Sequence, residues 1–381
     1  MLEKFLNDKP LYYDEIDYSR MPRVYERIKD KISIPKVIHL IGTNGKGTTG
    51  RFLASALYSL GFRVGHYSSP HIIDFNERIW INGQNATITS LNFAHKNLLQ
   101  ILVEDEANSL SYFEYTTLLA MFVFQNLDYI VLEAGLGGEY DATAVFPTIL
   151  TLVTPIDRDH EAFLGNTIQE IATTKLNSIQ NNAIIANQLN QEVYEVAENI
   201  SKKKSVNIYK IDTFLESEDL QKIEIISKKL SLVEYLKNNL QLSISALKFL
   251  EIKYSENDFK NSKLFGRLTP LTDNILLDVG HNILAAKSIY LSLKESKYIL
   301  IYNSYKDKNY REILTILKPM IKHIEIINID DNRIEDKNIL TEVIESLNMK
   351  NSNFSEIKKD EKYLVFGSFK VVEEFLKSYN G

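Results

Sequence analysis

The sequence predicts an α/β protein with two domains, each built on a mostly parallel sheet. Three observations support this prediction. The chain has 381 residues, which exceeds one typical domain, and 44% of them are hydrophobic. Apolar runs of strand length alternate with longer helical patterns, as in βαβ units. Residues 37–62 also have the pattern of a buried strand, a glycine-rich turn and a helix.

The turn after this first strand has the composition of a phosphate-binding loop. It reads GTNGKGT over residues 42–48, and its glycines allow successive backbone N–H groups to point at an anion. Lysine and threonine then add a positive charge and a hydroxyl group for a magnesium ion, which disfavours the alternative of a purely structural turn. The expected ATP-binding residues here are Thr43, Asn44, Gly45, Lys46, Gly47 and Thr48.

Composition excludes several classes of protein. A net charge of −6 provides no electrostatic footprint for nucleic acid or an anionic membrane. The absence of cysteine excludes disulfides, thiolate metal sites and a cysteine nucleophile. Neither a signal peptide nor an apolar run of membrane-spanning length is found, so we expect a cytoplasmic protein without nucleic-acid or membrane partners.

The first domain is expected over residues 1–262, as a P-loop ATPase-type domain with a mostly parallel sheet. Residues 1–34 have a helical pattern, and a strand ending at Tyr67 is broken by a Ser-Pro turn that starts at Ser69. Two amphipathic helical patterns follow over residues 89–124. Residues 127–132 then form a continuous apolar run, as expected of a central parallel strand.

Glu133 follows directly after this run. An acid at the carboxyl end of a parallel strand lies at the edge where open α/β sheets bind ligands, and magnesium prefers carboxylate oxygen. Glu133 is therefore a candidate metal ligand, with a solvent-facing strand cap as the alternative.

The second domain is expected over residues 263–381. Strand and helix patterns alternate there, which predicts a smaller Rossmann-like α/β domain.

From the residues alone, a structural role is favoured over metal binding for His160 at the end of a predicted strand, and the Ser-Pro segment is best explained as a simple turn. Arg267 suits phosphate binding because its planar donors bind oxygens in pairs.

Seven motifs resemble the folate branch of the Mur ligase superfamily, which contains folylpolyglutamate synthase and dihydrofolate synthase. They span nearly the whole chain in the family's order: GTNGKGT at 42–48, SPH at 69–71, FNERI at 75–79, ING at 81–83, DHEAFLGNTI at 159–168, GR at 266–267 and DVGHN at 278–282.

This resemblance implies roles for individual residues. Ser69, Glu133, His160 and Thr48 would hold magnesium, and a carbamylated Lys175 would hold a second ion. Arg267 would bind the ATP phosphates, Asp278 the ribose, and His281 would lie near the reacting groups. Lys46, Lys175 and His281 are the expected catalytic residues. The chain departs from the family around Lys175, with TKLNS over 174–178, and at Ala144, where the family has asparagine.

The resemblance implies an ATP-dependent ligase of folate biosynthesis that joins L-glutamate to dihydropteroate, to reduced folates, or to both, through an acyl phosphate. The expected cofactors are ATP, two Mg²⁺ ions and a monovalent cation. A monomer suffices for this chemistry. Two alternatives are a peptidoglycan-type Mur ligase, which lacks the SPH, FNERI and ING motifs, and a P-loop regulatory protein that binds ATP without ligation. The resemblance also implies an asparagine that contacts adenine near the start of the last helix of the first domain. In this chain the corresponding position is Gln241 or Leu242.

Overall fold

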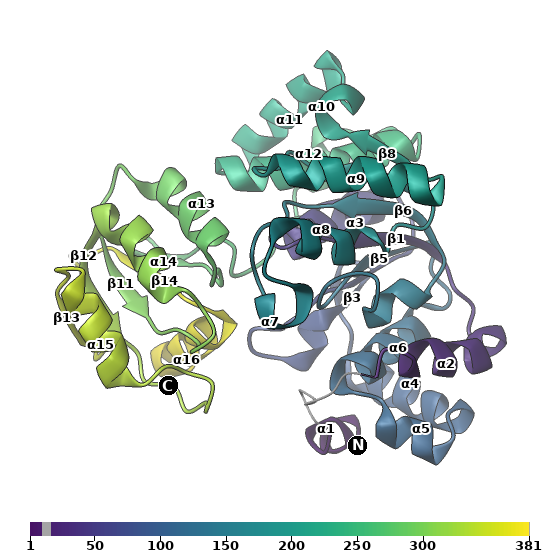
Figure 1. The fold of residues 1–381 in the computed structure, drawn as a ribbon, viewed down its shortest axis with the longest axis horizontal. Helices are drawn as coiled ribbons and strands as arrows, with labels where there is room; N and C mark the ends of the chain where they lie inside the picture. The colour runs from purple at the N-terminus through teal and green to yellow at the C-terminus, as the bar shows by residue number, and fades with distance from the viewer. Residues whose placement is uncertain (10–16, 381) are drawn as a thin grey trace. The chain divides into compact units, whose positions relative to one another are not determined.

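The computed structural model describes residues 1–9 and 17–380, which form two compact units (Figure 1). The first unit contains residues 1–232 and 236–262, and the second contains residues 233–235 and the chain from Lys263 onward. The helical pattern predicted for residues 1–34 appears as α1 (Leu2–Asn7) and α2 (Arg20–Ile28). The part of that prediction at residues 10–16 lies outside the described residues.

The first unit is built on a mostly parallel sheet, as the sequence predicts. Within the described residues this sheet has eight strands in the order β4-β3-β2-β5-β1-β6-β7-β8. The strands from β2 to β8 in this order run parallel, and β3 and β4 are antiparallel to their neighbours. The strand bounds are β1 (Lys36–Ile41), β2 (Val64–Tyr67), β3 (Ile79–Ile81), β4 (Gln84–Asn85), β5 (Tyr129–Glu133), β6 (Thr148–Val153), β7 (Asn182–Ile185) and β8 (Asn207–Lys210).

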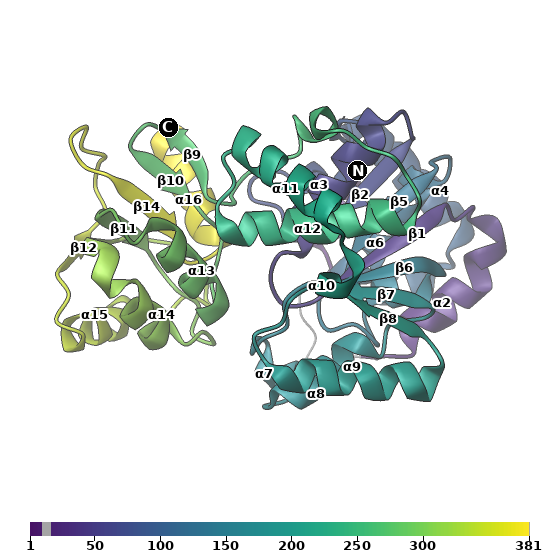
Figure 2. The same ribbon diagram turned by 90° about the horizontal axis from the view of Figure 1, so that it is seen from above.

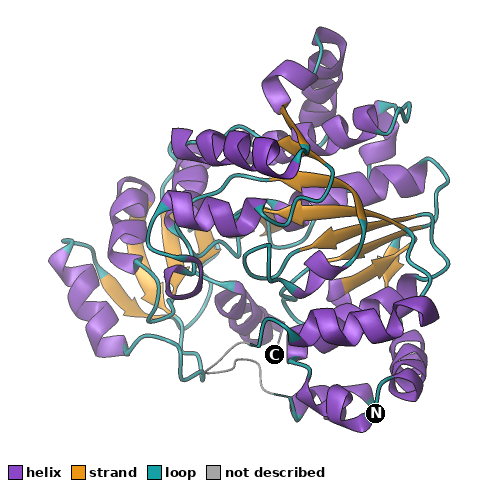
Figure 3. Cartoon of the chain, turned by 45° about the vertical axis from the view of Figure 1, so that its right-hand side comes forward, coloured by secondary structure: helices purple, strands orange, loops and turns teal. Residues whose placement is uncertain are grey.

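Helices cover both faces of this sheet, and Figure 3 shows them on either side of the strands. Because side chains alternate along a strand, β1 contributes to both faces. Ile38 and Leu40 pack with residues of α3, α11 and α12. Val37 packs with residues of α2 and α6, and Ile41 packs with residues of α8 and α9 (Figure 2). The first unit is therefore a three-layer structure with β1 buried at its centre.

The helices of the first unit include the one predicted after the glycine-rich turn and the two predicted over residues 89–124, between which a further short helix, α5, is found. Their bounds, beyond α1 and α2, are α3 (Lys46–Ser59), α4 (Ile88–Ile101), α5 (Glu104–Ser109), α6 (Tyr112–Phe124), α7 (Glu161–Leu164), α8 (Ile168–Leu176), α9 (Gln191–Lys204), α10 (Ile211–Phe214) and α11 (Ser217–Lys229). Helix α12 (Glu234–Phe249) begins with residues that group with the second unit and continues in the first.

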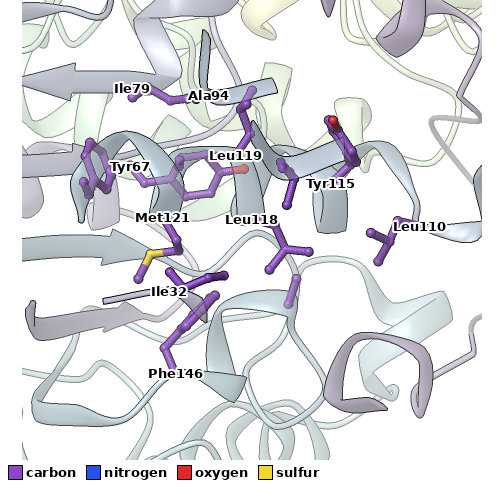
Figure 4. Packing of buried hydrophobic residues seen from close by; sticks show 14 of the residues in the cluster. Ile32, Tyr67, Ile79, Ala94, Leu110, Tyr115, Leu118, Leu119, Met121 and Phe146 are labelled. Carbon is purple, nitrogen blue, oxygen red and sulfur yellow. The ribbon is translucent and has the colours of Figure 1, made fainter. Parts of the chain in front are cut away.

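One hydrophobic cluster holds α6 against the sheet (Figure 4). Leu118, Leu119 and Met121 of α6 are buried there beside Phe146 and Ile32. Helix α6 is apolar around most of its circumference, which is expected of a helix enclosed by other elements.

The second unit has its own sheet of six strands within the described residues, in the order β13-β12-β11-β14-β10-β9. All neighbours are parallel except β9 and β10, so the predicted Rossmann-like α/β arrangement is confirmed. The bounds are β9 (Thr269–Thr272), β10 (Ile275–Leu277), β11 (Tyr298–Tyr302), β12 (Ile321–Ile326), β13 (Asn351–Asn353), β14 (Tyr363–Phe366), α13 (Ile283–Leu293), α14 (Tyr310–Leu317), α15 (Lys337–Ser346) and α16 (Phe369–Asn380).

The packing of α6 predicts the effect of a cavity on stability. Leu119 is 0% exposed, so Leu119→Ala should lower the free energy of unfolding by about 2–5 kcal/mol. Leu189 is 69% exposed in the same unit, and Leu189→Ala should change it by less than about 0.5 kcal/mol. Urea unfolding followed by the fluorescence of Trp80, the chain's single tryptophan, measures both variants. Equal transition midpoints would contradict the packing.

Candidate active site

The glycine-rich turn joins the centre of the sheet to α3. Strand β1 ends at Ile41 and α3 begins at Lys46, as the sequence predicts. Gly42 and Gly45 have φ angles of 134° and 93°, which side-chain-bearing residues rarely adopt. A Cβ atom at Gly42 would lie 2.0 Å from Thr154 Oγ1, so the neighbouring strand end also requires glycine there.

The loop after β6 fixes the conformation of this turn. The Thr43 backbone N–H donates to the Pro155 carbonyl oxygen over 2.9 Å, and the Asn44 N–H donates to the same oxygen over 3.4 Å. The Thr43 hydroxyl donates to the Asp157 carbonyl oxygen and accepts from the Asp157 N–H, over 2.9 and 3.0 Å. These bonds hold the turn against the loop after β6.

Lys46 lies over the turn that carries it. Its ammonium group donates to the carbonyl oxygens of Gly42 and Thr43, over 3.2 and 3.3 Å. The same nitrogen is 3.9 Å from Glu133 Oε1, so the loop lysine and the strand-end acid form an ion pair.

Glu133 is brought together with two of the other predicted site residues. Its carboxylate is buried, it contacts Lys46, and its Oε2 atom accepts a hydrogen bond from the Ser69 backbone N–H over 3.3 Å. Strands β5 and β2 are parallel neighbours, so their carboxyl ends, Glu133 and the turn after Tyr67, meet at one edge. The Ser69–Pro70 peptide bond is cis.

Thr48 presents an unusual buried hydroxyl group. Its Oγ1 atom is inaccessible to solvent and has no hydrogen-bond partner. Buried polar groups are normally satisfied, so this orphaned oxygen in the first turn of α3 indicates a missing ligand. A divalent cation held by Thr48 and Glu133 oxygens would satisfy it, and oxygen atoms of this kind are the donors that magnesium prefers. Within residues 1–9 and 17–380, no three His, Asp or Glu residues gather as a self-sufficient metal cage.

His160 has a strained backbone and a partly exposed ring. Its φ angle is 53°, it precedes the short helix α7, and its Nε2 atom is 4.0 Å from Asp159 Oδ1. The ring therefore lies beside the carboxylate of the preceding aspartate.

Lys175 reaches the glycine-rich turn from α8. Its ammonium group is buried and donates to the Gly42 carbonyl oxygen over 3.1 Å. Burial first, and then the charge of Lys46, lowers the pKa of Lys175 to about 7. The neutral amine form of Lys175 is therefore well populated near pH 7. Although the residues around it differ from the family motif, Lys175 itself reaches the glycine-rich turn.

Two features of the site were missed by sequence reasoning. Asn239 of α12 lies against the turn, since a Cβ atom at Gly45 would be 2.5 Å from its Oδ1 atom. Asn239 thus makes the contact of this helix with the turn. The adenine contact expected at Gln241 or Leu242 stays a prediction. Asn239 falls at helical spacing with the buried Leu236, Leu240 and Ser243, and an asparagine on that buried face is the signal that could have found it.

The second missed feature is a buried polar chain beneath the loop after β5. Asp141 accepts hydrogen bonds from the N–H groups of Leu136 and Thr143, and from the Thr143 hydroxyl. The Thr143 hydroxyl also lies 2.8 Å from His39 Nε2 on β1. Burial lowers the pKa of His39 to about 4, so this histidine is neutral at pH 7. The chain ties the loop that follows Glu133 to the strand that carries the glycine-rich turn.

The remaining predicted residues lie in the second unit. Arg267 lies in a turn before β9, with its guanidinium carbon 5.0 Å from the centre of the Phe369 ring. Asp278 follows β10 and is buried. His281 lies before α13, with Nδ1 3.2 Å from the Val279 carbonyl oxygen. All three come from the turns at one end of β10.

A glycine-rich turn between a central parallel strand and a helix, with a loop lysine and an acid on the adjoining strand, defines a P-loop protein. Comparison with known proteins narrows this class. No protein-family model matches the chain. It is 30% identical to the dihydrofolate synthase/folylpolyglutamate synthase of Haemophilus influenzae, over 95% of this chain and 93% of the relative. The chain belongs to the dihydrofolate synthase/folylpolyglutamate synthase family.

Solved structures agree with this assignment. The crystal structure of Helicobacter pylori folylpolyglutamate synthetase matches with a TM-score of 0.81 and 36% identity, covering 100% of this chain and 98% of that one. The Yersinia pestis bifunctional folylpolyglutamate synthase/dihydrofolate synthase, complexed with AMPPNP and a manganese ion, shares the fold at 22% identity and a TM-score of 0.84, covering 100% and 97% of the two chains. Among the described residues, no helix is long and apolar enough to cross a membrane.

The approach of Asn239 to Gly45 predicts that Gly45→Ala lowers ATP affinity by about tenfold or more, because the methyl group displaces the turn. Gly61→Ala is the matched control: its φ of 92° imposes a similar backbone strain, but nothing lies within 4 Å of the added Cβ. Titration calorimetry and thermal unfolding compare the two variants. Similar ATP affinities would show that the Asn239 contact does not constrain the loop.

Proposed function

We propose that this chain is an ATP-dependent ligase that adds L-glutamate to the carboxylate of dihydropteroate, of reduced folates, or of both. The observation that supports this most directly is the constellation of Lys46, Glu133 and the unpartnered Thr48 hydroxyl at the carboxyl edge of the sheet. It occurs in a chain that belongs to a family of glutamate ligases.

The acceptor carboxylate would attack the γ-phosphorus of ATP, with ADP as the leaving group, to give an acyl phosphate. The amine of glutamate then attacks the acyl carbon, phosphate leaves, and the amide forms. Lys46 lies where it can offset the charge of the phosphates as two anions approach each other. From the second unit we assign Arg267, Asp278 and His281 to the ATP-binding and reacting end of the site.

A divalent cation is expected between the phosphates and the strand-end acid. Thr48, Glu133 and Ser69 would hold it, with His160 as a further ligand. The bound cation supplies Lewis-acid stabilisation of the phosphate oxygens. The manganese ion and AMPPNP of the Yersinia pestis protein support the use of a metal and a nucleotide. The substrates are small molecules, and a single chain suffices for this chemistry.

Lys175 is proposed to act as a carbamate that holds a second cation. Only a neutral amine reacts with carbon dioxide, and a pKa of about 7 makes the neutral form abundant at physiological pH. Carbamylation would turn an ammonium group that competes with Lys46 for the Gly42 carbonyl into a carboxylate-like anion.

The alternatives from other classes have less support. A peptidoglycan-type Mur ligase does not fit a chain whose curated relative across 95% of its length is a folate enzyme. A regulatory protein that binds ATP without ligation would not need the paired Lys46 and Glu133 together with an unpartnered Thr48 hydroxyl.

A product assay tests the function. Purified protein with ATP, magnesium and glutamate should add one glutamyl group to dihydropteroate, to tetrahydrofolate, or to both, as read by mass spectrometry. Lys46→Ala and Glu133→Ala should each reduce the rate by about a hundredfold or more, because phosphate charge and the metal lose their partners. Addition to neither acceptor would refute the proposal, and undiminished turnover in a variant would remove that residue from the mechanism.

The state of Lys175 predicts a dependence on carbon dioxide. In buffer depleted of carbon dioxide at pH 8, above the pKa of about 7, activity should fall, and bicarbonate should restore it. The neutral fraction of a lysine grows as pH rises through its pKa, so restoration should be weaker at pH 6. Lys175→Arg keeps a cation that cannot be carbamylated and should not respond to bicarbonate. If bicarbonate does not change the activity of the wild-type protein, Lys175 is not carbamylated.

A further inference from the structure

The loop that carries Ser69 is closed at its base by the sheet. It joins β2 to β3, which pair antiparallel, and Tyr67 lies opposite Ile79 in their register. The Ser68 backbone N–H donates to the Arg78 carbonyl oxygen over 2.9 Å, which extends this pairing into the loop. The shape of the loop between these two ends therefore depends on its own hydrogen bonds and on its packing.

One carboxylate, that of Glu77, holds the backbone at the tip of this loop. Its Oε2 atom accepts a hydrogen bond from the Ile72 N–H over 2.8 Å. Its Oε1 atom accepts from the N–H groups of Ile73 and Asp74, over 2.9 and 2.8 Å. Three consecutive backbone donors thus converge on one side chain. Hydrogen bonds to a charged acceptor are stronger than those between neutral groups, so these bonds constrain the backbone of residues 72–74.

The segment that carries this carboxylate is itself anchored. The Glu77 N–H donates to the Asp74 carbonyl oxygen over 3.0 Å, in a short 3₁₀ helix at Phe75–Arg78. The Phe75 ring packs against the hydrophobic cluster that contains α6, with its centre 6.3 Å from the centre of the Tyr112 ring. The position of the carboxylate is therefore set by packing on the first unit.

A further bond connects the two sides of the loop. The Arg78 Nε–H donates to His71 Nδ1 over 2.8 Å, and the Arg78 guanidinium carbon lies 5.3 Å from the centre of the Tyr112 ring. Arg78 thus holds His71, and Glu77 holds residues 72–74. The arm of the loop formed by residues 71–74 is bonded throughout to the end of the loop.

Only Pro70 separates this arm from Ser69. The proline ring restricts its own φ angle, so few torsions remain between His71 and Ser69. The Ser69 N–H donates to Glu133 Oε2 over 3.3 Å, which places this serine beside the acid at the end of β5. A shift of the arm would therefore move Ser69 relative to Glu133.

We propose that Glu77 is a positioning residue for the cation site, which holds residues 72–74 so that Ser69 stays beside Glu133. Its effect on the cation passes through the loop backbone and Ser69. The proposal rests on the proposed function, because that function assigns Ser69 to the cation.

Nucleotide binding with and without a metal tests this role. Titration calorimetry of the full chain with AMPPNP, once in magnesium and once in EDTA, gives the factor by which the metal changes the affinity. Glu77→Gln keeps the size of the side chain, but it has one acceptor oxygen and turns an amide N–H group toward a backbone N–H. This variant should lower the metal factor about fivefold and leave the affinity in EDTA within about twofold of the wild type. Equal losses in magnesium and in EDTA would overturn the proposal.

A double-mutant cycle tests the route through Ser69. Ser69→Ala removes the hydroxyl group and should itself lower the metal factor. In that background Glu77→Gln should lower it further by less than about twofold, because the group it positions is absent. Equal losses in both backgrounds would show that Glu77 affects the cation by another route, and an undiminished factor in Ser69→Ala would remove Ser69 from the site. Either result would overturn the proposal.

Asp258→Asn is the matched control. The Asp258 carboxylate also accepts three hydrogen bonds, from the Ser255 N–H and hydroxyl over 2.7 and 2.9 Å and from the Ser59 hydroxyl over 2.8 Å. Ser59 ends α3, whereas the glycine-rich turn lies at the start of this helix, about 20 Å away. The control should leave the metal factor within about twofold of the wild type. A fall as large as that of Glu77→Gln would reduce the role of Glu77 to general stability and contradict the proposal.

These binding measurements use neither acceptor nor glutamate, so they are independent of the product assay. A failed product assay would refute the proposed function whatever the metal factor is. An unchanged metal factor in Glu77→Gln would overturn only the role of Glu77.

Discussion

Two lysines share one carbonyl oxygen at the centre of the first unit. Lys46 and Lys175 both donate to the Gly42 oxygen, over 3.2 and 3.1 Å. Burial, and then the repulsion between the two ammonium groups, lowers the pKa of Lys175. The surrounding structure keeps them there, because β1 and α8 are fixed by packing on the sheet. An anion bound at the P-loop would offset the repulsion between these two positive charges.

The acid at the end of β5 moderates this concentration of positive charge. Glu133 Oε1 lies 3.9 Å from the Lys46 ammonium nitrogen. The parallel pairing of β1 with β5 brings the end of β5 beside the turn that follows β1. In the proposed site the phosphates would meet the lysines, while the cation would meet Glu133 and the Thr48 hydroxyl. The polar chain from Asp141 through Thr143 to His39 stiffens the loop after Glu133 from below.

The second unit also has a turn that carries a charged side chain and is held by hydrogen bonds from another segment. In both units a turn with left-handed residues follows or precedes a strand, and hydrogen bonds from another segment hold it in shape. For the glycine-rich turn the holding groups are Pro155 and Asp157, and for the turn of residues 266–268, which carries Arg267, the holding group is Asp278. In each case the charged side chain that would meet ATP is carried by the turn, and its partners lie behind it. Orientation is therefore provided by backbone contacts before any ligand binds.

The sequence alone predicts the fold class, the P-loop between a strand and a helix, and Glu133 at the adjoining strand end. It could do so because apolar periodicity and glycine spacing are local properties, and because parallel strands bring their carboxyl ends to one edge. Only the tertiary structure decided which polar groups meet across that edge. The contact of Asn239 with Gly45, the shared Gly42 oxygen and the bond from Tyr235 to Asp278 join residues that are 43 to 194 positions apart in the chain or depend on exact helix register. Such pairings follow from packing, which no local pattern encodes.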